Sequence, residues 1–194
     1  MMTRHSIRSR LYAFYAWCAG GLFVLIAGIG IVLLPVLRWR RAAARRTARG
    51  LLRLAGMRLT VKGLENIPAG GCIIVANHAS YLDGVVLTAA LPPRFGFVIK
   101  REMTSVPLVS TLLHRLGSQF VERSDPSAIR ADTGRLIRSA ANGTALGIFP
   151  EGTFKREPGI GPFRLGAFRA ACRGGVPLIT CGIQGTRHIL PSET

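Results

Sequence analysis

The chain has 194 residues, enough for about one domain, which excludes a large multidomain assembly. Its 26 lysines and arginines stand against 9 aspartates and glutamates, for a formal net charge of +17. A hydrophobic fraction of 48% excludes intrinsic disorder, because disordered chains lack the apolar residues that build a core.

The first 60 residues hold eleven arginines and no acidic residue. Within them, Leu11 to Leu37 is an uncharged run of 27 residues, longer than the roughly 20 that a helix needs to cross a bilayer. A signal peptide has a shorter apolar core, about 7–15 residues, and is not followed by an arginine cluster. The run therefore predicts a retained anchor. It is either a hydrophobic membrane-spanning helix or, given Ala19-Gly20-Gly21 and Pro35, a helical hairpin that dips into one leaflet.

Seven arginines follow this run within residues 38–53, and three precede it. The positive-inside rule places the bulk of such a chain on the cytoplasmic side of the inner membrane. An arginine tract beside an apolar span also favours anionic lipid head groups over nucleic acid as its partner. We therefore expect membrane lipids as partners and no nucleic acid.

Four later apolar runs have the length of buried strands: residues 72–76, 95–99, 145–149 and 176–180. Between the middle pair, Asp125-Pro126 predicts the start of a helix, and Gly143 predicts its end. Continuous apolar strands separated by helices are typical of an α/β fold with a mostly parallel sheet flanked by helices.

The four cysteines, Cys18, Cys72, Cys172 and Cys181, are scattered and form no C-x-x-C pair. This pattern suggests neither a metal site nor a disulfide framework, and it suits a reducing cytoplasm.

The segment Asn77-His78-Ala79-Ser80-Tyr81-Leu82-Asp83 directly follows the first apolar run, and ligand crevices form at strand ends in open α/β sheets. If Ser80 caps a helix, Asp83 falls in its first turn and reaches back toward the cap, which brings it near His78. An imidazole held by a carboxylate is the pair that deprotonates a hydroxyl. Alternatively, Asp83 only caps its helix and His78 is an ordinary loop residue.

No G-x-S-x-G or similar nucleophile motif accompanies this pair, so the activated hydroxyl would belong to the substrate. Two further segments follow strands. Phe149 to Thr153 contains a glutamate beside a glycine turn, which either orients a polar substrate or satisfies backbone donors. Gly117 to Arg123 ends in an arginine suited to gripping a phosphate, and Lys100 and Arg101 could add to it.

Together these segments, in this order behind a predicted anchor, resemble the glycerophospholipid acyltransferase family, in its 1-acyl-sn-glycerol-3-phosphate acyltransferase branch. Asn77 to Asp83 is similar to the family's first motif and Gly117 to Arg123 to its second. Phe149 to Thr153 is similar to the third, and Val176 to Ile179 to the fourth. The resemblance covers roughly residues 60–188.

The resemblance implies a membrane-bound enzyme that moves a fatty acyl group from acyl-CoA or acyl carrier protein to the free hydroxyl of a lysophospholipid. His78 would be the general base and Asp83 would hold its working tautomer, with no acyl-enzyme. The resemblance also implies substrate-binding roles for further residues: Arg123 for the acceptor phosphate, Lys100 as a weaker candidate, Glu151, Gly152 and Thr153 for the acceptor site, and Pro177 on the acyl-donor side. No metal or other cofactor is implied, because a thioester is already activated.

Three features depart from the family pattern: Phe154-Lys155 after the third motif, Thr180 in the fourth, and an end at Thr194 where relatives usually continue. We accordingly expect an anchor and basic segment over residues 1–58 and an acyltransferase domain, C-terminally short beside those relatives, over 59–194. Two alternatives stay open. One is an acyltransferase for another lysophospholipid or an ornithine-type lipid, and the other is a non-catalytic membrane-surface tether that uses the arginine run.

Overall fold

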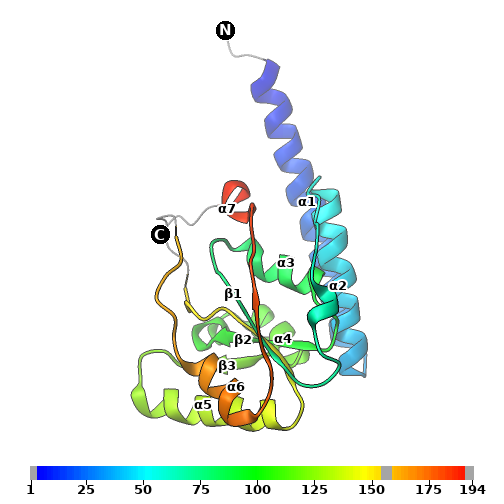
Figure 1. The fold of residues 1–194 in the computed structure, drawn as a ribbon. Helices are drawn as coiled ribbons and strands as arrows, with labels where there is room; N and C mark the ends of the chain where they lie inside the picture. The colour runs from blue at the N-terminus through cyan, green and yellow to red at the C-terminus, as the bar shows by residue number, and fades with distance from the viewer. Residues whose placement is uncertain (1–3, 154–158, 191–194) are drawn as a thin grey trace.

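The structure, a computed structural model, describes residues 4–153 and 159–190. Its centre is a five-stranded sheet with strand order β3-β2-β4-β1-β5, and every pairing in it is parallel (Figure 1). The strands are β1 (Ile73–Ala76), β2 (Phe95–Lys100), β3 (Gln119–Val121), β4 (Ala145–Ile148) and β5 (Leu178–Cys181). The predicted parallel α/β sheet is therefore confirmed.

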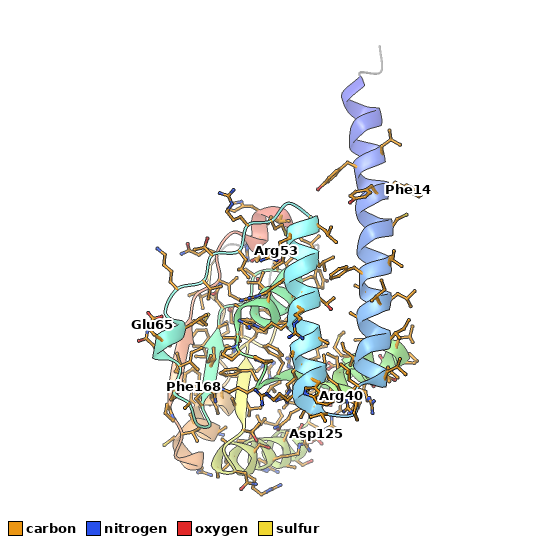
Figure 2. The ribbon with its side chains drawn as sticks, turned by 90° about the vertical axis from the view of Figure 1, so that its right-hand side faces the viewer. Phe14, Arg40, Arg53, Glu65, Asp125 and Phe168 are labelled. Atoms are coloured by element: carbon orange, nitrogen blue, oxygen red, sulfur yellow. The ribbon has the colours of Figure 1, made fainter. Side chains whose placement is uncertain are left out.

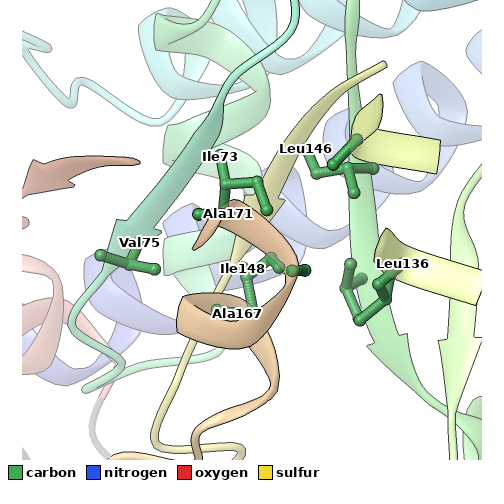
Figure 3. Close-up of a cluster of buried hydrophobic side chains, with 10 residues drawn as sticks. Ile73, Val75, Leu136, Leu146, Ile148, Ala167 and Ala171 are labelled. Atoms are coloured by element: carbon green, nitrogen blue, oxygen red, sulfur yellow. The ribbon is translucent and has the colours of Figure 1, made fainter. Parts of the chain in front are cut away.

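Helices cover both faces of this sheet. The helices that follow the N-terminal hairpin are α3 (Leu82–Ala90), α4 (Pro107–Arg115), α5 (Pro126–Ala141), α6 (Gly166–Gly174) and the short α7 (Thr186–Ile189), with 3-10 turns η1 (Leu64–Asn66) and η2 (Arg101–Ser105). On one face, α5 and α6 bury a cluster that includes Ile73, Leu146 and Leu136 (Figure 3). On the other face, Leu87 of α3 packs with Ile74 and Ala145. Burial on both faces explains why these strands are continuously apolar rather than alternating.

Helix α5 begins where the sequence predicts. The Asp125 carboxylate accepts hydrogen bonds from the backbone N–H groups of Ser127 at 2.9 Å and Ala128 at 3.3 Å, while Pro126 occupies the first turn. These bonds satisfy donors that have no partner inside the helix, and proline loses nothing there because its missing N–H would be unpaired anyway. The helix ends at Ala141, two residues before Gly143.

Most of the uncharged N-terminal run lies in α1 (Arg4–Leu33), and its last residue, Leu37, begins α2 (Leu37–Leu54). The two helices lie side by side as a hairpin (Figure 2). Pro35 interrupts helical hydrogen bonding because it lacks a backbone N–H. The Arg40 side chain donates to the carbonyls of Leu34 at 2.7 Å and Pro35 at 2.8 Å, which stabilises the turn. Among the described residues there is no helix with the length and hydrophobicity needed to span a bilayer, which corrects the expectation of a membrane-spanning helix over Leu11 to Leu37.

Several arginines of α2 contact backbone carbonyls of the α/β domain. Arg41 donates to the carbonyls of Arg94, Leu116 and Gly117 at 2.6, 2.9 and 3.4 Å. Arg45 and Arg49 donate to the carbonyls of Ala90 and Ala89 in the last turn of α3, at 3.3 and 2.8 Å. These contacts fasten α2 to the domain, whereas the N-terminal part of α1 projects beyond it (Figures 1 and 2).

Candidate active site

His78 and Asp83 meet immediately after β1. The chain leaves the sheet at Ala76, and α3 begins at Leu82, so His78 lies in the connecting loop and Asp83 in the first turn of the helix. His78 Nδ1 lies 2.9 Å from Asp83 Oδ2. The helix begins after Tyr81, one residue later than a Ser80 cap implies, but the Ser80 hydroxyl still accepts from the Leu82 N–H at 3.1 Å. The predicted juxtaposition of the two side chains is present.

The Asp83 carboxylate is completely buried yet charged. Its Oδ2 also accepts hydrogen bonds from the backbone N–H groups of Ala79 at 2.6 Å and Ser80 at 2.8 Å. Burial by itself would raise the pKa of Asp83, but hydrogen bonds from His78, the Thr186 side chain and these two amides outweigh it, so the pKa is lowered. The Asp83 carboxylate is thereby placed to accept a hydrogen bond from Nδ1 of His78, which leaves Nε2 as the other ring nitrogen.

The C-terminal part of the described chain supports this turn, which the sequence reasoning did not foresee. Asn77 makes a two-point contact with Ile183: its Nδ2 donates to the carbonyl at 3.0 Å, and its Oδ1 accepts from the N–H at 2.7 Å. The buried Ser80 hydroxyl donates to the Leu190 carbonyl at 2.6 Å. Contacts between residues more than a hundred positions apart leave no periodic signal in the sequence.

Glu151 is buried beside the pair and organises the backbone around it. Its Oε1 accepts from the His78 N–H at 2.8 Å, and its Oε2 accepts from the Gly161 N–H at 2.7 Å. One carboxylate therefore ties the His78 loop to the loop that leads into α6. Phe149, two residues earlier, stacks on the imidazole with ring centroids 4.1 Å apart and an angle of 14° between the rings. Together these contacts fix the ring plane of His78.

His78 opens onto a cavity of about 870 Å³. The polar residues that line this cavity include His78, Lys100, Arg123 and Thr153, whereas most of its wall is apolar. That apolar wall comes from α1, α2, α3, β2 and α4, and includes Val24, Gly28, Ile31, Leu51, Val85, Val109 and Leu112. An imidazole at one part of a large apolar cavity suits a substrate with a long hydrocarbon chain. The sequence did not predict that the N-terminal hairpin contributes to this wall, because its apolar residues are equally typical of a segment that contacts lipid.

The basic candidates lie in different settings. The half-buried Arg123 follows β3 and donates from Nη1 to the Gly152 carbonyl. Lys100 also lines the cavity, but its Nζ lies 3.2 Å from Glu102 Oε1 in an exposed ion pair. Arg101 turns to Asp132, at 3.1 Å. Arg123 is therefore the basic candidate that contacts the third motif.

Gly152 and Thr153 line the cavity with His78. Pro177 does not join them. It lies just before β5, and its carbonyl accepts from the Ile73 N–H at the start of β1, whereas His78 follows the end of β1. The parallel register therefore puts Pro177 at the N-terminal ends of the strands, whereas His78 lies beyond their C-terminal ends. Phe154 and Lys155 lie outside the described residues, and no group of three or more potential metal ligands gathers within the described part of the chain.

Comparison with known proteins finds a matching family model and similar proteins. The Acyltransferase family model matches residues 58–184. A chloroplastic 1-acyl-sn-glycerol-3-phosphate acyltransferase from Brassica napus is 31% identical over 134 residues, 68% of this chain and 39% of that protein. The 1-acyl-sn-glycerol-3-phosphate acyltransferase of Saccharomyces cerevisiae is 31% identical over 140 residues, 71% of this chain and 46% of the yeast protein. The chain thus spans less than half of the length of either relative.

A solved structure is similar over nearly the whole chain. It is the 1-acyl-sn-glycerophosphate (LPA) acyltransferase PlsC from Thermotoga maritima, with a TM-score of 0.74 and 24% sequence identity. The alignment covers 97% of this chain and 79% of that one. At this level of identity, the likeness establishes a shared fold.

Proposed function

Because the chain belongs to the acyltransferase family, we propose that it transfers a fatty acyl group to the free hydroxyl of 1-acyl-glycerol-3-phosphate, giving phosphatidic acid. The acyl donor in this proposal is acyl-CoA or acyl carrier protein. The observation that carries the proposal is the His78–Asp83 pair at the wall of a large apolar cavity. The names of the relatives support the same acceptor.

In the proposed reaction, His78 Nε2 takes the proton of the acceptor hydroxyl while Asp83 stabilises the imidazolium that forms. The hydroxyl oxygen attacks the thioester carbonyl carbon, and the C–S bond then breaks. The departing thiolate takes the proton back from His78, which returns the pair to its starting state. The thioester is already activated, so the proposal calls for no metal and no acyl-enzyme.

The remaining cavity residues receive roles according to their chemistry. Arg123 would bind the acceptor phosphate, since its planar guanidinium suits a phosphate better than the ammonium of Lys100, which already pairs with Glu102. Gly152 and Thr153 would shape the acceptor site beside it. Glu151 would act indirectly, through the backbone of His78. The apolar wall would hold an acyl chain.

We further propose that the protein works at the cytoplasmic face of the inner membrane, with residues 1–58 against the lipid and residues 59–194 as the acyltransferase domain. Support comes from the exposed apolar side chains of α1, among them Leu11, Phe14, Leu22, Leu25 and Leu33. Arg38, Arg46 and Arg53 are exposed on the neighbouring α2 and could meet anionic head groups.

The proposal is tested by measuring labelled acyl transfer from acyl-CoA, and separately from acyl carrier protein, to lysophosphatidic acid with the full chain in membranes. We expect His78→Ala to lower turnover by about a hundredfold or more, since general-base catalysis contributes that much. His114→Ala is the matched control, because His114 is exposed on α4 and does not line the cavity. Substantial turnover by His78→Ala would overturn the assignment of the base.

The acceptor is tested separately. Rates on lysophosphatidic acid are compared with rates on a lysolipid that carries a phosphodiester and on an ornithine-type lipid. Preference for the phosphomonoester supports phosphatidic acid as the product. Preference for either other acceptor would keep the chemistry and replace the substrate.

A further inference from the structure

Two arginine side chains converge on Gly152, and only one of them belongs to the family-like motifs. A Cβ atom on Gly152 would lie 2.9 Å from Arg164 Nε and 3.6 Å from Arg123 Cζ. Gly152 also has a positive φ of 76°, which favours glycine. The absence of a side chain at this position therefore lets both guanidinium groups approach the same backbone. Gly152 and Arg123 themselves line the cavity that contains His78.

Backbone and side-chain contacts fix both arginines. Arg123 donates to the Gly152 carbonyl, and Arg164 Nη1 donates to the Arg123 carbonyl at 3.2 Å. The Arg164 backbone N–H donates to the Pro150 carbonyl at 2.8 Å, so the third motif and the segment before α6 are joined at this point. The backbone of Arg164 is thus held in place, although its side chain is exposed.

The nearby carboxylates are already engaged elsewhere. Glu122 accepts from the Ser124 hydroxyl at 2.7 Å and lies 3.8 Å from Arg101, and Glu102 pairs with Lys100. Within the described residues, neither Arg123 nor Arg164 forms an ion pair with a carboxylate. Burial lowers the pKa of Arg123, and the charge of Arg164 lowers it further, against smaller opposing effects of the Glu102 and Glu122 charges. Two like charges held together in this way are stabilised when an anion binds between them.

We propose that Arg164 is a second phosphate-binding residue, which together with Arg123 grips the terminal phosphate of the acceptor lipid and selects a phosphomonoester over a phosphodiester. This inference rests on the proposed function. A phosphomonoester carries about −1.5 to −2 charges at neutral pH and three acceptor oxygens, so it can engage both guanidinium groups. A phosphodiester carries only one negative charge, so it would compensate one of the two guanidinium charges and leave the other without a counter-charge.

The test compares Arg164→Gln and Arg164→Lys with Arg169→Gln in the full chain. Arg169 is an exposed arginine on α6 that makes no contact with Gly152, so it is a matched control. For Arg164→Gln we expect the KM for lysophosphatidic acid to rise about tenfold or more, the effect of losing a charge-assisted hydrogen bond, while kcat and the KM for the acyl donor change little. Arg164→Lys should recover part of the loss, because it restores the charge without the planar fork.

Selectivity gives the second readout. Arg164→Gln should reduce the preference for lysophosphatidic acid over a phosphodiester lysolipid, and Arg169→Gln should leave it unchanged. An unaltered KM and preference in Arg164→Gln, or an equal change in Arg169→Gln, would overturn the inference. Unfolding temperatures of the three variants are compared with wild type, since a fall confined to Arg164→Gln would assign the residue a structural role.

Direct binding separates this inference from the proposed function. Calorimetric titration of the wild-type chain with lysophosphatidic acid is repeated with Arg164→Gln in the absence of an acyl donor. Wild-type binding that weakens in the variant supports the phosphate site even if no acyl transfer is found. Normal turnover with equal binding by both proteins would retain the function and reject the role of Arg164.

Discussion

Asp83 is an ionised side chain that water does not reach, and its charge is compensated at short range. Oδ2 alone accepts from His78 Nδ1, Ala79 N and Ser80 N, all within 2.9 Å. Two of these three donors are backbone amides of the turn that precedes α3. The same carboxylate therefore stabilises the turn and orients the imidazole, so its removal should affect both folding and catalysis.

We expect Asp83→Asn to lower turnover by about a hundredfold or more and to reduce the free energy of unfolding at pH 7 by about 1 to 3 kcal/mol, because an amide places a donor against donors. The pKa of Asp83 in the folded state is below its ordinary value of 3.8. Its ionisation thus stabilises the fold above that pH, and this stabilisation is lost as the pH falls through the lowered pKa.

Urea unfolding of wild type and Asp83→Asn at several values between pH 5 and pH 3 checks the linkage. The difference between the two proteins should be largest at the upper end of this range and should shrink toward the lower end. A difference that stays constant across the range would contradict the lowered pKa.

At the scale of elements, the arginines of α2 fall into two groups, those that contact backbone carbonyls of the domain and those that are exposed. Arg41, Arg45 and Arg49 recur every four residues and share one face of the helix, which lies against the domain. Arg45 and Arg49 reach the last turn of α3, where carbonyls have no partner inside the helix and positive charge is favourable. Arg38, Arg46 and Arg53 of the same helix are exposed.

Arg41→Met should reduce the free energy of unfolding by about 1 to 3 kcal/mol, since it leaves the carbonyls of Arg94, Leu116 and Gly117 without their donor. The Arg41 side chain is half-buried, and this burial lowers its pKa. The carbonyl acceptors around it compensate its charge. Arg46→Met, on the exposed face of the same helix, should change stability by less than about 0.5 kcal/mol. Equal losses in urea unfolding would show that the carbonyl contacts contribute nothing.

At the scale of the whole molecule, the apolar cavity exists only because the N-terminal hairpin and the α/β domain are packed together. Its wall combines residues from α1, α2, α3 and α4. Gly28 of α1 faces α4 across this wall, and a Cβ atom added to it would lie 3.8 Å from Leu112 Cδ2. Gly30 lies on the same helix, has no atom within 4 Å of such a Cβ, and does not line the cavity.

Gly28→Leu should fill part of the cavity and shift the preference of the enzyme toward shorter acyl chains, by about tenfold in kcat/KM between the longest and shortest chains. Gly30→Leu adds the same side chain to the same helix and should leave the preference unaltered. The measurement is the rate of transfer across a series of acyl donors of increasing length. The same preference in both variants would mean that the acyl chain does not occupy this part of the cavity.

The parallel sheet, α5 and the meeting of His78 with Asp83 were predictable because each depends on local signals. Buried strands are continuously apolar, Asp-Pro caps a helix, and a carboxylate in the first turn of a helix reaches back to the loop before it. Pro35 likewise predicts a break in the N-terminal segment, which the sequence leaves open between a spanning helix and a hairpin. These features involve residues a few positions apart.

Other features involve residues that only the fold brings together. The sequence determined that Arg41 and Arg49 share a helical face, but not that this face turns to backbone carbonyls rather than to lipid. It also could not show that Arg164 reaches Gly152 or that α1 lines the cavity. Such placements depend on how separate elements pack, because periodicity defines which residues share a face and tertiary contacts decide what that face meets.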